Sequence, residues 1–572
     1  MPSKTIMGIS NLDVRSHDNT ACILKDGKLL AQAEEERFTR RRYAYDSLPI
    51  QSIRYCLDAT GTAPADVDTI AVGWDLPHAV FDKNRTPVVT SDTRTIIGKL
   101  LGPGAEPERT DLRFVKHHHA HAEVAYHTSG FHDAAILVVD GAGESDATTL
   151  WTAGDSLRII DAKGQYPDSL GFMYEGVSEY LGFKGNEAGK VMGLAAHCSD
   201  SVEPFDIVTF QNGYSVRFPR TIHEAVLREF VEKDNYYVMD EIAAHWIRYC
   251  ETLFGPRVPY EPHLGEDHPD FRRRARVAAI LQKTLEEAVL SCVKLLKRET
   301  GSDNLCMGGG VALNCSANGR VDRSGVFPHT FIYPATNDAG VALGAALHIL
   351  REERADVPRV TIDHAFWGPE FSDDKIAKLL RESSISFTEC REDFSDIAEM
   401  ISRGAIVGWF QGRMEIGPRA LGARSILADP RSIGTRDRVN ILKGREHWRP
   451  LAPSILEGYE AEFFEDGAPS PFMLKAHKVR PEKRALIPAV THVDHSSRHQ
   501  SVSQRTNPRF WKLIESFRRL TGIPMLLNTS FNRKEPIVCT PQDALRTFPQ
   551  CKLDHLVLGK FRIQQHPSPL AV

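Results

Sequence analysis

The stretch Ala134-Ala-Ile-Leu-Val-Val-Asp140-Gly-Ala-Gly-Glu-Ser-Asp146-Ala-Thr-Thr-Leu-Trp-Thr-Ala153 decides the fold class. It predicts two strands, Ala134–Asp140 and Asp146–Ala153, because β-forming residues stand on both sides of a glycine-rich break. The turn between them is expected at Gly141-Ala-Gly143. This arrangement places the Asp140 carboxylate at the end of an apolar strand.

A similar unit lies near the N-terminus, where Thr5–Ser10, Thr20–Lys25 and Lys28–Ala33 predict three strands. Asp26-Gly27 between the last two is a strong signal for a tight hairpin. Two hairpins of this kind indicate an internal duplication. The actin/hexokinase/heat-shock ATPase fold has such a duplication, in which two βββαβα halves present hairpin loops to phosphate across a cleft. We therefore expect an α/β fold with an actin-like N-terminal domain.

A long amphipathic helix is predicted from Arg272 to Thr300, and Gly301 ends it. A strand at Leu305–Met307, the turn Gly308-Gly-Gly310 and a helix at Val311–Ala317 follow. A strand, a glycine turn and a helix start together place backbone N–H groups where an anion can bind. A tight turn needed only for packing gives the same pattern, and the sequence leaves both interpretations open.

Turn-forming residues after a predicted helix at Ala339–Arg354 indicate a domain boundary near 355–370. Beyond it the sequence predicts helices at Asp373–Glu382 and Ser395–Ser402, a strand at Ala405–Phe410 and another short strand before Asn528. We therefore expect two α/β domains, residues 1–355 and 370–572.

The composition is that of a globular protein and excludes several classes. The 572 residues include 70 Lys+Arg and 75 Asp+Glu, a net charge of −5, with 42% apolar residues. Such values exclude a collagen, a disulfide-rich miniprotein and a mainly disordered chain, and they disfavour binding to nucleic-acid phosphates. The N-terminus lacks the apolar run of a signal peptide, and the ten cysteines are scattered without a CxxC pair. Both observations favour a cytoplasmic protein with buried thiols.

The run Lys116-His-His-His-Ala-His-Ala122 is predicted to be helical. His117 and His121 are four residues apart, so they share a helix face and can bind one metal ion. Asp140 ends a strand and Asp338 opens a helix, positions that face the ligand side of α/β folds. Two imidazoles and two carboxylates would suit Fe(II), Mn(II) or Zn(II). Without converging carboxylates, an HxxxH pair is more often a coincidence.

Two shorter motifs in the N-terminal half each have a functional and a structural interpretation. His17, beside Asp18 in the first hairpin loop, could take a proton from an attacking hydroxyl near neutral pH, or could simply cap its own turn. Lys190 follows the glycine-rich turn in Gly185–Leu194, and it could contact a phosphate or extend into water.

The C-terminal unit has a denser motif, built of cations among glycines and apolar residues. Its members are Arg413, Arg419, Arg424, Lys443, Arg445, Arg449, Arg498 and Arg505, followed by Asn528-Thr-Ser530-Phe-Asn532. Arginines in apolar surroundings are costly unless they meet an anion. Because the whole chain is slightly acidic, a small polyanion such as a nucleoside triphosphate fits better than a nucleic acid. Salt bridges to neighbouring carboxylates are the structural alternative.

Together these motifs resemble the NodU/cephem-type O-carbamoyltransferase family. The resemblance rests on His17-Asp18, Glu34–Arg40, His117–Ala122, Val139-Asp140-Gly, Gly189–Leu194, Gly308–Asn314, Asn337–Gly340, Gly412–Arg424 and Asn528–Asn532. It implies an actin-like first domain similar to the threonylcarbamoyl-tRNA transferase subunit, and a YrdC-like second domain. The second domain would form carbamoyl-adenylate from carbamoyl phosphate and ATP. The first would hold this intermediate with a bound metal while an acceptor hydroxyl attacks its carbonyl carbon.

The resemblance also implies roles for individual residues. His117, His121, Asp140 and Asp338 match the metal site, with Fe(II) as the metal. His17 matches the base near the acceptor. Lys190, Gly193, Gly308, Gly309, Gly310 and Asn314 fall where the first domain holds adenylate. Arg419, Arg424, Lys443, Arg449, Arg498, Asn528, Ser530 and Asn532 match the adenylating pocket.

The implied partners are small molecules. They are ATP with Mg(II), carbamoyl phosphate and an acceptor with an aminoglycoside- or macrolide-type sugar hydroxyl. No nucleic acid or membrane is expected, and the oligomeric state stays open, with a homodimer as one option. One departure stands out, because the family has a Lys-His pair where this chain reads Arg40-Arg-Arg-Tyr43.

Two alternative functions share parts of this pattern. A tRNA threonylcarbamoyl-type modification enzyme would use the same metal and nucleotide sites, but it needs a basic RNA-binding face, which the net charge of −5 disfavours. A non-catalytic, ATP-binding regulatory module of the actin-like class would keep the nucleotide site alone.

Overall fold

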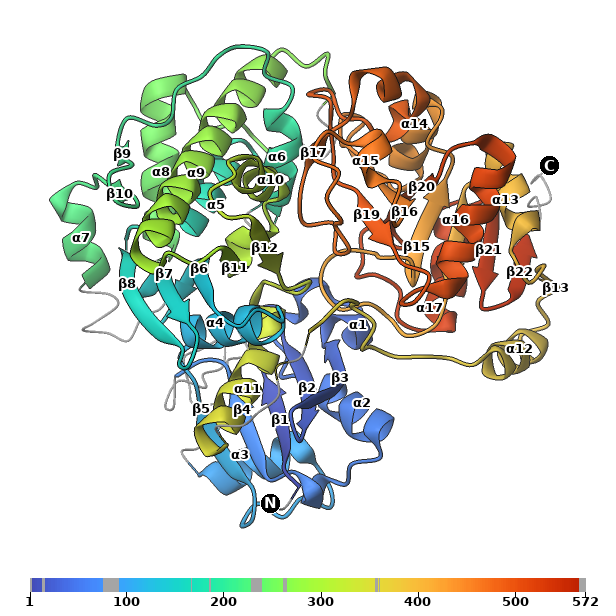
Figure 1. Cartoon of the computed structure of the whole chain (residues 1–572), viewed down its shortest axis with the longest axis horizontal. Helices are drawn as coiled ribbons and strands as arrows, with labels where there is room; N and C mark the ends of the chain where they lie inside the picture. The colour runs from blue at the N-terminus through green and yellow to red at the C-terminus, as the bar shows by residue number, and fades with distance from the viewer. Residues whose placement is uncertain are drawn as a thin grey trace. The chain divides into compact units, whose positions relative to one another are not determined.

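The computed structural model describes residues 3–12, 16–75, 92–165, 167–184, 187–227, 239–260, 265–354, 359 and 361–564. The chain forms two compact units (Figure 1). Unit 1 consists of Met1–Leu30 and Asp46–Ile362, and unit 2 of Ala31–Tyr45 and Asp363–Val572. The change of unit after Ile362 lies inside the expected boundary region. The segment Ala31–Tyr45, which we expected in the first domain, groups with unit 2.

Unit 1 contains two five-stranded sheets of the same topology. The first has the order β3-β2-β1-β4-β5, and the second β12-β11-β6-β7-β8. In the first sheet, β1 pairs antiparallel with β2 and parallel with β4. In the second sheet, β6 pairs in the same way with β7 and β11. The strands are β1 (Thr5–Ile9), β2 (Thr20–Lys25), β3 (Lys28–Glu34), β4 (Thr69–Val72), β5 (Asp111–Phe114), β6 (Ala134–Gly143), β7 (Asp146–Ala153), β8 (Arg158–Gln165), β11 (Asn304–Gly308) and β12 (His329–Ile332). The predicted α/β class and the duplication are both observed.

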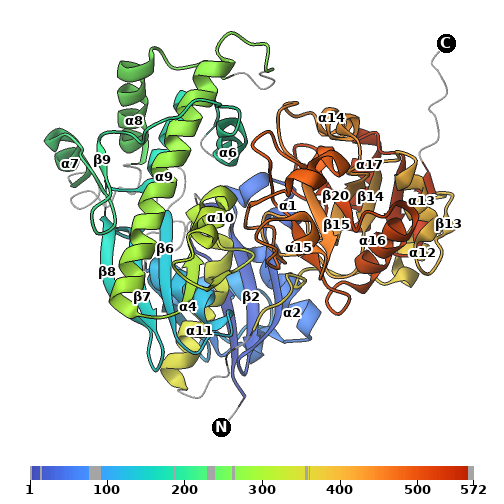
Figure 2. The same cartoon turned by 45° about the horizontal axis from the view of Figure 1, so that its top comes forward.

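The helices of unit 1 surround these sheets. They are α2 (Ile50–Thr60), α3 (Thr93–Leu101), α4 (His117–His127), α5 (Leu170–Tyr180), α6 (Gly189–Ala195), α7 (Arg220–Leu227), α8 (Met239–Phe254), α9 (Phe271–Thr300), α10 (Cys315–Arg323) and α11 (Val341–Glu353), with a small ribbon of β9 (Val208–Thr209) and β10 (Ser215–Val216). The long helix α9 lies across the second sheet, where it contacts β6 and β7 (Figure 2). It ends at Gly301 in the left-handed conformation, as the sequence predicts.

Two local predictions in unit 1 were wrong. Strand β6 continues through Gly143 with a register shift after Val139, so the turn falls at Glu144-Ser145 rather than at Gly141–Gly143. The helix expected at Val311–Ala317 is instead a 3-10 turn followed by α10. The reason is that Asn314 caps α10, its side chain accepting a hydrogen bond from the Ala317 N–H at 3.0 Å.

Helices α4 and α11 pack against each other between the two sheets of unit 1. Helix α11 contacts β1, β2 and β4, whereas α4 contacts β6, β7 and β11. The close approach depends on Gly344 in α11, because a Cβ atom there would lie 1.9 Å from the Ala120 carbonyl oxygen of α4. Candidate site residues His117 and His121 lie on α4, and Asp338 lies just before α11.

Gly344→Ala is therefore expected to lower the free energy of unfolding by about 1–3 kcal/mol, the usual cost of overpacking. Urea unfolding followed by circular dichroism measures the change. Gly98→Ala in α3 is the matched control, because its nearest neighbour is a Pro107 carbon at 3.9 Å. The control should be neutral or stabilising by up to about 1 kcal/mol. Equal midpoints for the two variants would contradict the packing account.

Unit 2 is built on an eight-stranded sheet with the order β13-β22-β21-β14-β15-β20-β16-β19. The strands are β13 (Thr388–Glu389), β14 (Val407–Phe410), β15 (Arg424–Ala428), β16 (Ala452–Leu456), β19 (Gln500–Val502), β20 (Met525–Ser530), β21 (His555–Leu558) and β22 (Phe561–Gln564), with a separate pair β17 (His477–Lys478) and β18 (Ser496–Ser497). The helices are α1 (Glu36–Thr39), α12 (Asp373–Glu382), α13 (Ser395–Ser402), α14 (Ile433–Leu442), α15 (Glu460–Phe463), α16 (Pro508–Thr521) and α17 (Pro541–Gln550). The strand expected before Asn528 includes that residue.

The segment Ala31–Tyr45 is held in unit 2 by buried polar contacts. The Arg37 guanidinium donates to Glu34 at 2.8 Å and to the Gly417 carbonyl oxygen at 2.8 Å. Arg40, where the family pattern is broken, donates to the Pro536 and Ile537 carbonyl oxygens at 2.6 and 2.7 Å. These contacts make Arg40 a scaffold residue of unit 2.

No helix among the described residues combines the length and the apolar character needed to cross a membrane. All ten cysteines lie in the described part of the chain, seven are buried, and each is a free thiol.

Candidate functional site

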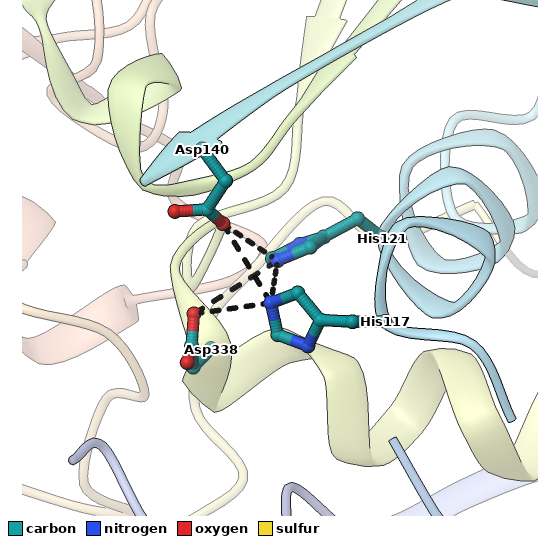
Figure 3. A group of neighbouring side chains, drawn as sticks. All are labelled: His117, His121, Asp140 and Asp338. Atoms are coloured by element: carbon teal, nitrogen blue, oxygen red, sulfur yellow. Dashed lines mark hydrogen bonds and ion pairs between the residues drawn. The ribbon is translucent and has the colours of Figure 1, made fainter. Parts of the chain in front are cut away.

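Four side chains predicted as metal ligands meet in the interior of unit 1 (Figure 3). His117 and His121 project from one face of α4, Asp140 from β6 and Asp338 from the turn that precedes α11. All four are buried, and one donor atom from each lies within 4.8 Å of the others. His117 and Asp338 are 221 positions apart in the sequence, and the duplicated topology brings them together.

The donor distances fit a single metal ion. His121 Nε2 lies 3.0 Å from Asp140 Oδ2 and 3.1 Å from His117 Nε2, and His117 Nε2 lies 3.5 Å from Asp338 Oδ1. The remaining two His–Asp distances are 3.8 and 3.9 Å. Ligand atoms about 2.0–2.2 Å from one metal ion lie about 2.8–3.6 Å apart at angles of 90–109°. Three of the five distances fall in that range and the other two slightly exceed it, so the residues present fit a divalent cation.

Neighbouring groups hold the ligands in the required orientation. His117 Nδ1 lies 3.0 Å from the Gly73 carbonyl oxygen, so Nδ1 donates there and the Nε2 lone pair faces the cluster. The Asp140 carboxylate accepts hydrogen bonds from the N–H groups of Gly141 at 2.7 Å and Gly310 at 3.1 Å. These contacts leave His117 Nε2 and the free side of the Asp140 carboxylate directed at the centre of the four-residue cluster.

The electrostatics of the cluster favour a positive charge. Burial lowers the pKa of His117, but Asp338 and Asp140 outweigh it and raise that pKa to about 10. Burial raises the pKa of each of the two aspartates, but the facing histidines outweigh it and hold both values below the usual range. Without a metal ion, the site therefore retains a proton on His117.

The glycine turn Gly308–Gly310 lies directly against the metal cluster. Gly309 has φ of +88°, and a Cβ atom there would lie 2.2 Å from the Val139 carbonyl oxygen. A Cβ atom on Gly310 would lie 3.2 Å from an Asp140 carboxylate oxygen. The turn is thus required for close packing around Asp140, and it also directs the Gly310 N–H toward that carboxylate.

His17 lies in the first hairpin loop, with 44% of its side chain exposed. Its Nδ1 is 3.2 Å from Asp18 Oδ2, and the same oxygen accepts a hydrogen bond from the Asn337 side chain at 2.7 Å. Asn337 directly precedes the ligand Asp338. Desolvation lowers the pKa of His17, but Asp18, Asp338 and Glu175 raise it to about 10. The loop therefore brings a histidine into the electrostatic field of the metal site.

Glu175 in α5 is a residue of this region that the sequence did not indicate. Burial raises its pKa to about 7, with His17 opposing the shift and Asp140 adding to it. The surrounding sequence Leu170–Tyr180 is an apolar helix with no motif. Only the fold reveals that this carboxyl group lies in the field of His17 and Asp140.

The other candidates of unit 1 have internal partners. Lys190 forms an ion pair with Glu187 at 2.7 Å, and Gly193 is buried in the same helix, α6. Besides capping α10, the Asn314 side chain exchanges two hydrogen bonds with Gln282, each 3.0 Å long. These contacts give Asn314 a structural task, and the adenylate contact stays a prediction. Residues 185 and 186 of the predicted glycine-rich turn lie outside the described residues.

Unit 2 brings several of the predicted pocket residues together. Buried Lys443 donates from Nζ to the carbonyl oxygen and the side-chain oxygen of Asn532, both at 2.8 Å, and to Ser530 Oγ at 3.3 Å. Burial, together with repulsion from Arg445 and Arg449, holds the pKa of Lys443 well below its usual range. The pKa of Arg445 is lowered in the same way, by burial and by Arg449. Lys443, Arg445 and Arg449 therefore form a crowded group of cations, the cationic cluster.

Arg498 belongs to this cationic cluster as well, because its charge also lowers the pKa of Arg445, after burial and Arg449. Two carboxylates oppose these shifts. Glu446, 3.9 Å from the Arg449 guanidinium, acts on Arg445, and Glu535 acts on Lys443. The four cations outnumber the two carboxylates, so an anion would relieve their mutual repulsion.

Two residues predicted in the adenylating pocket have internal partners. Arg424 is fully buried, and its guanidinium donates to the carbonyl oxygens of Gln411 at 2.8 Å and Pro369 at 2.9 Å and lies 3.6 Å from the centre of the Phe410 ring. The Asn528 side chain donates to Ser454 Oγ of β16 at 2.9 Å. Each residue therefore has a structural task, and its role toward ATP stays a prediction. Arg419 is half-buried on the segment before β15.

Family models match nearly the whole chain. One described as Carbamoyltransferase N-terminus matches residues 5–347, and one described as Carbamoyltransferase C-terminus matches residues 398–565. The chain belongs to the carbamoyltransferase family. It is therefore an enzyme, a carbamoyltransferase, and the family predicted from its motifs is confirmed.

The alignments with curated relatives cover most of this carbamoyltransferase and most of each relative. Nodulation protein NolNO of Sinorhizobium fredii is 37% identical over 96% of this chain and 79% of its own. Nodulation protein NolO of Bradyrhizobium diazoefficiens is 38% identical over 80% of each chain. An uncharacterized Synechocystis protein, sll1178, is 34% identical over 99% of this chain and 97% of its own.

Solved structures give a weaker likeness. Full-length HypF in a phosphate- and nucleotide-bound form is 13% identical over 62% of this chain and 47% of its own, with a TM-score of 0.35. The ROK hexokinase from Thermus thermophilus is 12% identical over 61% of the carbamoyltransferase and 99% of its own chain, with a TM-score of 0.28. TM-scores this low add nothing to the strand topology described above.

Proposed function

We propose that this carbamoyltransferase forms carbamoyl-adenylate from carbamoyl phosphate and ATP and transfers the carbamoyl group to a sugar hydroxyl of a small secondary metabolite. The observation that carries the proposal is the buried cluster of two histidines and two aspartates with His17 in its field. A metal centre beside a titratable histidine suits attack by a hydroxyl on an activated carbonyl. The cationic cluster of unit 2 suits the phosphates of ATP and carbamoyl phosphate.

The adenylation step is assigned to unit 2, for which we propose a YrdC-like role. In the net reaction, carbamoyl phosphate, ATP and one water give carbamoyl-adenylate, pyrophosphate and inorganic phosphate. Water attacks the phosphorus of carbamoyl phosphate, and the bond from that phosphorus to the carbamate oxygen breaks, which gives carbamate and inorganic phosphate. A carbamate oxygen then bonds to the α-phosphorus of ATP, the bond between the α- and β-phosphates breaks, and pyrophosphate leaves. Lys443, Arg445, Arg449 and Arg498 would neutralise the charge of the substrates and of the leaving pyrophosphate, with Mg(II) accompanying ATP.

The transfer step is assigned to unit 1. The acceptor oxygen bonds to the carbamoyl carbon, the bond from that carbon to the adenylate oxygen breaks, and AMP leaves. The acceptor proton passes to His17 Nε2, while Asp18 holds Nδ1–H. A divalent cation bound by His117, His121, Asp140 and Asp338, Fe(II) in our proposal, would polarise the acyl-adenylate. The buried setting of these ligands limits hydrolysis of the activated intermediate.

His17→Asn is expected to spare adenylate formation and to lower carbamoyl transfer by about 10²–10⁴-fold, the usual contribution of a general base. His17 must be neutral to act as a base. A cation beside Asp338 would offset the negative charge of Asp338, which is one of the charges that raise the pKa of His17, and would therefore lower that pKa. The wild-type transfer rate should therefore rise with pH up to the pKa of His17 in the metal-loaded enzyme, whereas the variant should lack this dependence. His132→Asn, at an exposed loop position, is the control. Equal loss of both steps would refute this division of roles.

An acceptor screen tests the proposal directly. Metal-loaded protein is incubated with ATP, Mg(II), carbamoyl phosphate and a panel of aminoglycosides and macrolide glycosides, and the products are analysed by mass spectrometry. A product heavier by one carbamoyl group supports the proposal. Absence of any carbamoylated small molecule, together with retention of bulk tRNA in a gel shift at moderate salt, would favour the tRNA-modifying alternative.

A further inference from the structure

A second group of possible metal ligands lies between α4 and α11, separate from the four-residue cluster. It consists of His119 and Glu123 on α4 and His348 on α11. The Glu123 side chain is 3% exposed, whereas the two histidine side chains are 27% and 17% exposed. A buried carboxylate is thus reached by two imidazoles that are partly open to solvent. His119 lies within the His117–Ala122 motif, but neither the resemblance nor the proposed reaction gives a role to His119, Glu123 or His348.

The distances within this group fit a three-ligand cation site. Glu123 Oε1 lies 3.5 Å from His119 Nε2 and 3.1 Å from His348 Nδ1. The two imidazole rings are tilted by 58° to each other, with their centres 4.2 Å apart. Ligand atoms about 2.0–2.2 Å from a tetrahedral zinc ion lie about 3.3–3.6 Å apart. The two histidine–Glu123 distances lie in or close to that range, and the three donor atoms lie within 4.8 Å of one another. Three protein ligands would leave the fourth position for water.

His348 contacts a carboxylate through each of its ring nitrogens. Nδ1 makes a hydrogen bond with Glu123 Oε1 at 3.1 Å, and Nε2 lies 3.3 Å from Glu352 Oε1. A carboxylate that orients a ligating histidine through its other nitrogen is a common feature of metal sites, and Glu352 is placed for that task.

The second oxygen of Glu123 is used by other groups. Oε2 lies 2.9 Å from His127 Nε2 and 3.4 Å from the Arg351 guanidinium. These contacts fix the plane of the carboxylate and leave Oε1 directed at His119 and His348. The carboxylate is thus oriented before any ligand arrives.

We propose that His119, Glu123 and His348 bind a second divalent cation of the Zn(II) type, which ties α4 to α11. Helix α4 carries His117 and His121, and α11 begins three residues after Asp338. A cation that joins the two helices therefore fixes the spacing between ligands of the four-residue cluster. Two imidazoles and a carboxylate form a donor set that zinc accepts.

Metal stoichiometry tests the proposal. The full-length protein is stripped with a chelator, dialysed against Zn(II) alone and assayed by inductively coupled plasma mass spectrometry. We expect two equivalents in the wild type and one in His119→Ala/His348→Ala. One equivalent is also expected in His121→Ala/Asp140→Asn, and none when all four changes are combined. His132→Ala, an exposed histidine outside both groups, should keep two equivalents.

Thermal unfolding gives a second readout. Zn(II) should raise the Tm of His121→Ala/Asp140→Asn, because only the α4–α11 site remains there, and should leave the four-fold variant unchanged. If His119→Ala/His348→Ala does not fold, the milder single variant His119→Leu must show the loss of one equivalent. One equivalent in the wild type, or two in the folded His119 and His348 variants, would overturn the proposal.

Discussion

Replacing Asp140 by asparagine is expected to remove the metal from the four-residue cluster and to lower carbamoyl transfer by about 10³-fold or more, since a metal supplies several kcal/mol of charge stabilisation. Asp140 Oδ2 lies 3.0 Å from His121 Nε2, so its loss removes both a ligand and half of the negative charge that faces the two imidazoles. The measurement combines metal content with the rate of product formation at saturating ATP and carbamoyl phosphate. Pyrophosphate release without acceptor should persist in this variant, because adenylation is assigned to unit 2.

Asp133→Asn is the matched control for this variant. Asp133 directly precedes β6 and is exposed, and its side chain accepts a hydrogen bond from Ser302 at 2.7 Å. We expect this variant to keep wild-type metal content and transfer rate within about twofold, as for surface substitutions outside a site. An Asp140→Asn enzyme that transfers carbamoyl at the wild-type rate would show that the cluster has no part in catalysis.

Lys443→Met is expected to reduce pyrophosphate release in the presence of carbamoyl phosphate by about 10²–10³-fold, the usual cost of removing one preorganised group that stabilises developing charge. Lys443 is buried, donates to Asn532 at 2.8 Å and lies among Arg445 and Arg449. Methionine keeps most of the side-chain volume and removes the charge. Product formation should fall in parallel, because no adenylate would be available for transfer.

Arg438→Ala provides the matched control for the cationic cluster. Arg438 lies on α14, five residues before Lys443, but it is half-exposed and pairs with Asp554 at 2.7 Å. Its removal should change pyrophosphate release by less than about threefold, because exposed ion pairs contribute little. If Lys443→Met and Arg438→Ala had the same effect, the cationic cluster would not be the adenylating site.

Much of the fold followed from local sequence signals. The hairpin at Asp26-Gly27, the helix that begins at His117 and the left-handed end of α9 at Gly301 each depend on a few neighbouring residues. The convergence of the candidate metal ligands could be predicted as well, because strand ends and helix starts meet in a duplicated α/β fold. His117, His121, Asp140 and Asp338 do lie together in the structure, whereas metal binding by them stays a prediction.

The remaining features depend on contacts that a sequence does not reveal. Arg424 is a residue type that often binds anions, but its guanidinium donates hydrogen bonds to backbone carbonyl oxygens. Asn314 lies in a glycine-rich motif but caps a helix and pairs with Gln282. Glu175 belongs to an apolar helix, and only tertiary packing brings it into the field of His17. Burial and competing partners decide these cases, and both are long-range properties.

The most direct test of the central claim is the exchange of labelled pyrophosphate into ATP, measured without any acceptor. The account predicts exchange that requires carbamoyl phosphate, continues in Asp140→Asn and falls by about 10²–10³-fold in Lys443→Met. Formation of carbamoylated product by the wild type without any such exchange would contradict the account, because carbamoyl-adenylate would then not be the intermediate.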